Sequence, residues 1–111
     1  MDRVNEWRAL IKQIIRDYAA FDPSTRDVAA ETIFDDEHGH YELVHVGWEG
    51  ARRVHGAVIH VDIRDGRIWI QHDGTEPGIA GQLLAAGVAP GEIVMGFHPR
   101  GSATFPRYAT G

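Results

Sequence analysis

Cysteine is absent from the 111 residues, which excludes disulfide bonds, thiolate metal sites and cysteine nucleophiles. Lysine occurs only as Lys12, so the chain has no glycine-rich phosphate loop, which needs a lysine near its end. The serines, Ser24 and Ser102, do not lie in the Gly-x-Ser-x-Gly turn of hydrolases. We therefore expect no catalytic residues and no enzyme activity.

Long hydrophobic runs are also missing. No stretch approaches the roughly 18–20 apolar residues of a membrane span. The N-terminus, residues 1–6, is charged and no apolar run follows it, unlike a signal peptide. The length suits one domain with a single core. We expect one cytoplasmic domain over residues 1–111 that does not bind membranes.

Basic charge is scarce. Sixteen acidic residues against eleven basic ones give a formal net charge of -5. Nucleic-acid binders usually carry a basic face, because phosphate neutralisation supplies most of their nonspecific affinity. The charge balance therefore disfavours direct contact with DNA and favours contact with other proteins.

The first segment has apolar residues at helical spacing and predicts a helix from about residue 3 to 20. Asp2 is a suitable N-cap, and Phe21-Asp22-Pro23 ends the helix because a residue before proline disfavours the α region. The apolar positions are Val4, Trp7, Leu10, Ile11, Ile14, Ile15 and Tyr18.

Four β-rich runs follow and predict an antiparallel meander. Asp65-Gly66 lies between two alternating runs and is a strong hairpin signal, because a type I′ turn needs positive φ at both central residues. The runs span residues 28–35, 40–48, 53–64 and 67–72.

A short second helix is predicted after the meander, with Thr75 as its N-cap and Gly87 as its stop. Residues 93–97 form a possible fifth strand, and the tail from about residue 98 is predicted to be irregular. The predicted fold class is α+β.

The Asp65-Gly66 turn fixes a register, which assigns residues to faces. Ala57, Ile59, Val61 and Ile63 take the core face, under the first helix. Extending the register through the looser earlier turns gives the second face mixed polar, apolar and aromatic residues. Either a later segment or a partner must cover such a face. The predicted partner-binding residues there are Tyr41, Val58, His60, Asp62, Trp69 and Gln71, and Phe34, Leu43 and His45 are placed beside them.

Histidine is frequent, with seven in the chain, but none lies in a His-Glu-x-x-His pair or another familiar ligand spacing. His60 and Asp62, two residues apart on one face, are the best metal candidates. We nevertheless expect no metal and no cofactor.

Two stretches resemble a known family. The first is Thr32-Ile33-Phe34-Asp35 with His40-Tyr41-Glu42-Leu43 and Val46-Gly47-Trp48. The second runs from Arg53-Val54-His55-Gly56 through Ile59 to Ala80. From about residue 3 to 99 the chain resembles the XisI family, the fdxN-element excision controlling factors. Residues 101–108 match the family's C-terminal segment only loosely.

The resemblance implies a non-enzymatic accessory role in site-specific excision of a DNA element, as in differentiating cyanobacterial heterocysts. There a separate site-specific recombinase does the strand chemistry, and XisI-type proteins act with a companion, XisH, that resembles nucleases. An XisH-like protein is the partner that the resemblance implies, and homo-oligomers are compatible with it.

Two other functions remain open from the residues. One is a small metal-binding or hydrolytic domain that uses His60, Asp62 and Gln71. The other is a direct DNA-binding module that uses Arg52, Arg53, Arg64 and Arg67.

Overall fold

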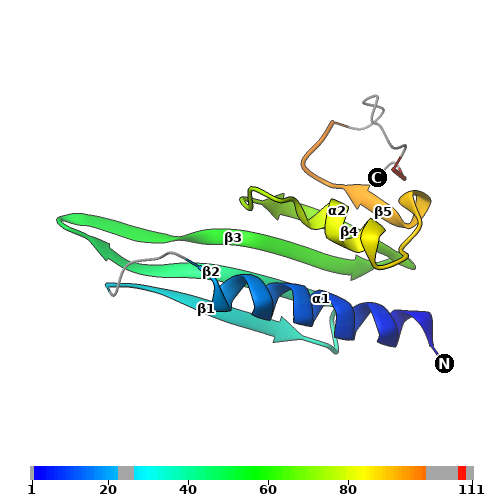
Figure 1. The fold of residues 1–111 in the computed structure, drawn as a ribbon, viewed down its shortest axis with the longest axis horizontal. Helices are drawn as coiled ribbons and strands as arrows, with labels where there is room; N and C mark the ends of the chain where they lie inside the picture. The colour runs from blue at the N-terminus through cyan, green and yellow to red at the C-terminus, as the bar shows by residue number, and fades with distance from the viewer. Residues whose placement is uncertain (1, 23–26, 100–107, 110–111) are drawn as a thin grey trace.

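The computed structural model describes residues 2–22, 27–99 and 108–109, and within them two α-helices accompany a five-stranded sheet (Figure 1). The strands are ordered β1-β2-β3-β4-β5 across the sheet. This confirms the predicted α+β fold, with the antiparallel meander in sequence order. The elements are α1 (Arg3–Ala20), β1 (Val28–Asp35), β2 (His40–Glu49), β3 (Arg52–Arg64), β4 (Arg67–Asp73), α2 (Ile79–Ala85) and β5 (Ile93–Met95).

Helix α1 begins and ends as its sequence predicts. The Asp2 carboxylate accepts a hydrogen bond from the N–H of Val4 at 3.0 Å, and Phe21 is the C-cap. The predicted apolar stripe turns towards the sheet, where Trp7, Ile11 and Ile15 are almost fully buried. Burial of this stripe holds the helix on the sheet, since an isolated helix of this length is marginal in water.

Helix α2 begins later than predicted, and Thr75 is not its N-cap. Asp73 instead accepts hydrogen bonds from the N–H and hydroxyl of Thr75 at 2.9 and 2.6 Å, and from the N–H of Ile79 at 2.7 Å. The aspartate therefore organises the turn that leads from β4 into the helix.

The end of helix α2 is the predicted glycine stop. Gly87 has φ +101°, and its N–H bonds to the carbonyl of Leu84 at 3.0 Å. The N–H of Val88 bonds to the carbonyl of Leu83, also at 3.0 Å. This pair of bonds is the Schellman motif, which satisfies carbonyls that the helix leaves free.

Strand β5 confirms the fifth strand, although it is shorter than predicted. It pairs in parallel with β4, so α2 forms the crossover between them. The predicted irregular tail falls largely outside the described residues, but Ala109 forms a parallel bridge with Val94.

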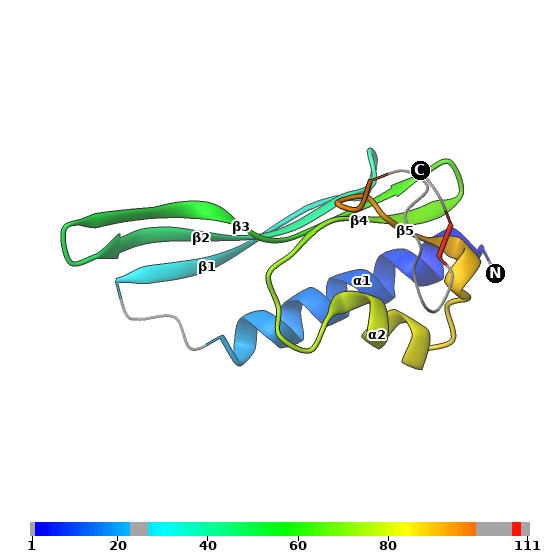
Figure 2. The ribbon, with the colours of Figure 1, turned by 90° about the horizontal axis from the view of Figure 1, so that it is seen from above.

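The two helices lie on the same side of the sheet, and the β2–β3 hairpin reaches beyond helix α1 (Figure 2). Tyr41, Leu43, Ile59 and Val61 are fully buried in one cluster with the helices. Side chains alternate along a strand, so the residues between these point to the other side. We call that side the open face. Among its members are Ile33, His40, Glu42, Trp48, Ala57, His60, Asp62, Trp69 and Gln71.

A β-bulge explains why part of the face prediction is wrong. Counting back from the turn at residues 50–51 would pair Tyr41 with His60, but the register shifts beside Val58 and pairs Tyr41 with Val61. The extra residue exchanges the two faces on one side of the bulge. Tyr41, Leu43, Phe34 and His45 therefore lie on the helix side, and exposed Ala57 lies opposite Val44 on the open face.

A second register shift lies between β3 and β4. Counting back from the Asp65-Gly66 turn would pair His60 with Gln71. His60 pairs with His72, while Val61 pairs with Ile70, so Gln71 is the additional residue. The turn itself is as predicted: Arg64 pairs with Arg67, and φ is 53° at Asp65 and 71° at Gly66. The residues of the turn determine the pairing next to it. They do not determine the bulge, which lies a few residues further along the strands.

The buried Tyr41 ties helix α1 to the turn between β1 and β2. Its hydroxyl donates to Asp36 at 2.9 Å, and the Lys12 ammonium donates to the same carboxylate at 2.8 Å. Burial raises the pKa of Tyr41 to about 12, with Asp36 adding to the effect. The hydrogen bond from Lys12 holds the pKa of Asp36 below its usual range.

Neither helix described has the length and hydropathy of a membrane-spanning segment.

Candidate functional site

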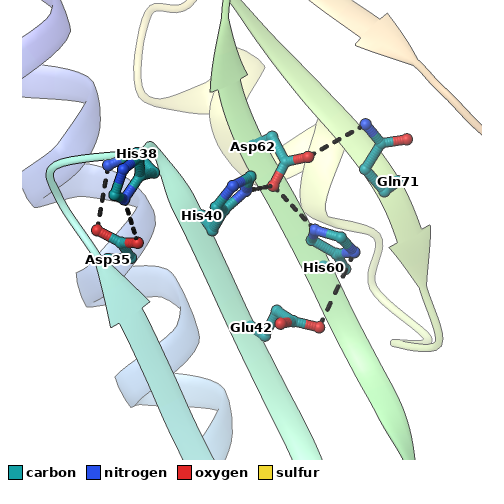
Figure 3. A network of polar contacts seen from close by, with 7 residues as sticks. All are labelled: Asp35, His38, His40, Glu42, His60, Asp62 and Gln71. Atoms are coloured by element: carbon teal, nitrogen blue, oxygen red, sulfur yellow. Dashed lines mark hydrogen bonds and ion pairs between the residues drawn. The ribbon is translucent and has the colours of Figure 1, made fainter.

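The most distinctive polar group on the open face is Asp62, the one charged residue that is buried as a whole among those the structure describes. His40 Nδ1 and His60 Nε2 each lie 2.8 Å from the same oxygen, Asp62 Oδ1 (Figure 3). Gln71 Nε2 donates to the other oxygen, Oδ2, at 3.2 Å. A buried carboxylate is costly unless it is paired and hydrogen-bonded, and three partners here meet that demand.

The sheet brings these side chains together from three strands. His40 lies directly opposite Asp62 in the β2–β3 pair, and His60 precedes Asp62 by two residues and shares its face. Glu42 lies opposite His60, and its carboxylate Oε1 is 3.9 Å from His60 Nδ1. We call His40, Glu42, His60, Asp62 and Gln71 the histidine–aspartate cluster.

The two histidines keep Asp62 ionised. Burial opposes ionisation of this carboxyl, but the hydrogen bond from His40 and the charge of His60 outweigh it, so the pKa of Asp62 is lowered. The same hydrogen bond to Asp62 raises the pKa of His40. The cluster thus couples a carboxylate to imidazoles that can hold a proton or bind a metal ion.

Four of the six predicted partner-binding residues lie together on the open face. They are His60, Asp62, Trp69 and Gln71; Trp69 is directly opposite Asp62 in the β3–β4 pair. The placement of the other two was wrong. Tyr41 is fully buried in the core, and Val58, at the bulge, packs against the core cluster.

Sequence reasoning left His40 and Glu42 out of the site. The alternation His40-Tyr41-Glu42-Leu43 was the signal that could have found them. Two large apolar residues at every second position predict a buried face, which leaves His40 and Glu42 on the opposite one. Gly56, inside β3, was a further signal of the bulge, since a glycine within a strand often accompanies one.

The four arginines of the DNA-binding alternative do not form one patch. Arg52 pairs with Glu49 and Arg53 stacks over the Trp48 ring, both at the tip of the β2–β3 hairpin. Arg64 lies at the other end of β3, with its guanidinium 3.9 Å from the centroid of the Trp69 ring. Arg64 lies eleven residue steps along β3 from Arg53, which is about 36 Å at the usual rise per residue.

Comparison with known proteins gives matches along the whole chain. The family model described as XisI protein matches residues 1–110. A XisI-like protein from Anabaena variabilis is 34% identical, with a TM-score of 0.91 over 98% of this chain and 100% of that one. The fdxN element excision controlling factor XisI from Anabaena variabilis is 30% identical, with a TM-score of 0.84 over 97% of this chain and 98% of that one.

No curated protein matches the sequence. The family model nevertheless covers nearly every residue, and both solved structures share the fold from end to end at 30% identity or more. The chain therefore belongs to the XisI family.

Proposed function

We propose that this chain is a non-enzymatic accessory protein that controls site-specific excision of a DNA element, and that it acts by binding an XisH-like protein. The observation that carries the proposal is its similarity to the fdxN element excision controlling factor XisI over 97% of this chain and 98% of that one.

The open face supports a protein partner. Ile33 and Trp48 are about half exposed there, at 49% and 50%, although both are large and hydrophobic. Trp69 lies on the same face under the guanidinium of Arg64. Exposed apolar groups within a polar surround mark interaction sites, and tryptophan and arginine are the residues that most often dominate them.

The charge distribution supports a protein rather than DNA as the direct contact. The chain carries a net charge of -5, and its arginine pairs lie at opposite ends of β3. Phosphate recognition needs several cations on one surface. The acidic side chains of the open face and its rim, among them Glu31, Asp35 and Glu42, instead suit a partner with a basic surface.

The chemistry of the histidine–aspartate cluster supports a role without nucleophilic catalysis. Its members carry imidazoles, carboxylates and an amide. The cluster therefore lacks the hydroxyl or thiol nucleophile of a catalytic triad.

Co-purification with an XisH-like protein from the same organism tests this proposal. We expect a stable complex at low salt and micromolar concentration. Trp69→Ala and Ile33→Asp should each weaken it at least tenfold, because they remove apolar area from the proposed contact or place a charge there. Affinity is measured by calorimetry or by surface immobilisation of the partner.

Phe21→Ala is the matched control. Phe21 is 86% exposed at the end of helix α1, away from the open face, so its removal should leave the affinity unchanged. Failure of the wild-type chain to associate, or equal affinities for Trp69→Ala, Ile33→Asp and the wild type, would contradict the proposed contact.

A further inference from the structure

Three side chains of the histidine–aspartate cluster bring metal-ligating atoms together. A nitrogen of His40, a nitrogen of His60 and a carboxylate oxygen of Asp62 all lie within 4.8 Å of one another. Two imidazoles and one carboxylate suit a divalent transition-metal ion, and zinc sites of this size keep a fourth position open. We propose that His40, His60 and Asp62 bind a divalent transition-metal ion, with zinc as the reference ion.

The present distances are compatible with such a site after a small adjustment. His40 Nδ1 and His60 Nε2 are each 2.8 Å from Asp62 Oδ1, with a proton shared in each contact. A tetrahedral ion about 2.0–2.1 Å from each donor needs its ligand atoms about 3.3 Å apart. Each of these two gaps must therefore open by about half an ångström, and the two nitrogens, which lie within 4.8 Å of each other, must take up the same spacing. The ion takes the place of the two protons, which leave as it binds.

The surrounding groups have the arrangement of an outer ligand shell. A histidine that binds a metal through one ring nitrogen usually directs the other towards a carboxylate or carbonyl. His60 turns Nε2 to Asp62 and has Glu42 Oε1 3.9 Å from Nδ1. Gln71 holds Asp62 Oδ2, which leaves Oδ1 facing the two imidazoles (Figure 3). Gln71 thus positions Asp62 by a hydrogen bond, and Glu42 lies near enough to His60 for an ion pair.

The site is open to solvent on one side. The His40 side chain is 55% exposed, while Asp62 retains 10% exposure. A bound ion would thus have a firmly held ligand in Asp62 and a more movable one in the exposed His40. Water or a side chain of a partner would complete its coordination. The proposal departs from the expectation of no metal, because the sequence alone did not place His40 beside Asp62. The inference does not depend on the proposed role in excision.

Zinc titration of tag-free protein tests the site, with calorimetry for affinity and elemental analysis after dialysis for stoichiometry. We expect one zinc per chain in the wild type. His40→Ala and His60→Ala should each weaken binding at least tenfold, and Glu42→Gln about tenfold through loss of an outer-shell partner. His38→Ala and His55→Ala each remove one histidine outside the trio and should leave the affinity unchanged.

Substitution of the exposed His40 is the decisive variant, because its loss leaves the core intact, whereas replacing the buried Asp62 also perturbs the fold. Cobalt(II) gives a second readout: visible ligand-field absorption in the wild type that is lost in His40→Ala, with unchanged circular dichroism. Less than a tenth of an equivalent of zinc in the wild type would overturn the proposal. Equal zinc affinity in the wild type, His40→Ala and His60→Ala would overturn it as well.

Discussion

Replacing Ile59 by alanine is expected to lower the free energy of unfolding by about 2–5 kcal/mol. Ile59 is fully buried in the cluster between the sheet and the two helices, opposite Leu43 of strand β2. The substitution removes three buried carbons and leaves a cavity whose walls cannot fully close. Urea denaturation, followed by circular dichroism, measures the loss.

Ile33 is the matched control, because the same substitution removes the same atoms from the opposite side of the same sheet. Its side chain is 49% exposed on the open face, so Ile33→Ala should change stability by no more than about 1 kcal/mol. A loss at Ile33 as large as the loss at Ile59 would mean that another segment of the chain covers the open face.

Gly39→Ala is the second substitution with a large expected effect, a loss of about 3 kcal/mol or more. Gly39 has φ +73°, and a Cβ there would lie 2.5 Å from the backbone carbonyl oxygen of Ile63. The left-handed conformation alone costs an alanine about 1–2 kcal/mol. The Ile63 N–H also donates to the Gly39 carbonyl at 2.8 Å, so the overlap can be relieved only by breaking the contact between the β1–β2 turn and strand β3.

Gly50→Ala separates the two causes. Gly50 also lies in a turn between strands with φ +62°, but nothing lies within 4 Å of a Cβ placed there. This variant should lose only the conformational cost, about 1–2 kcal/mol. Thermal and urea unfolding of both variants provide the comparison. Equal losses at the two glycines would show that the close approach of Gly39 to Ile63 has no energetic consequence.

The parts of the fold that could be predicted are those with a local cause. Asp2 and the apolar stripe of the first helix specify helix α1, and Asp65-Gly66 specifies the β3–β4 hairpin, because each signal lies within a few residues of the structure it determines. The start of helix α2 could not be predicted in the same way. Asp73 caps it from six residues before Ile79, a reach that no N-cap pattern describes.

The candidate site could be predicted in part, and one residue of register accounts for what was missed. His60 and Asp62 lie two apart on one strand, so their common face follows from alternation alone. His40 comes from another strand, and its place depends on the bulge at Val58, which reverses the faces on part of the sheet. Bulges depend on packing between strands, so local pattern does not specify them.

We propose that this chain controls excision through a partner that binds its open face. An excision assay on a plasmid-borne element, with a site-specific recombinase and an XisH-like protein of the same organism, tests it most directly. We expect excision to require this chain, to fall at least tenfold with Trp69→Ala, and to be retained with Phe21→Ala. Excision at the same rate without the chain would contradict the account.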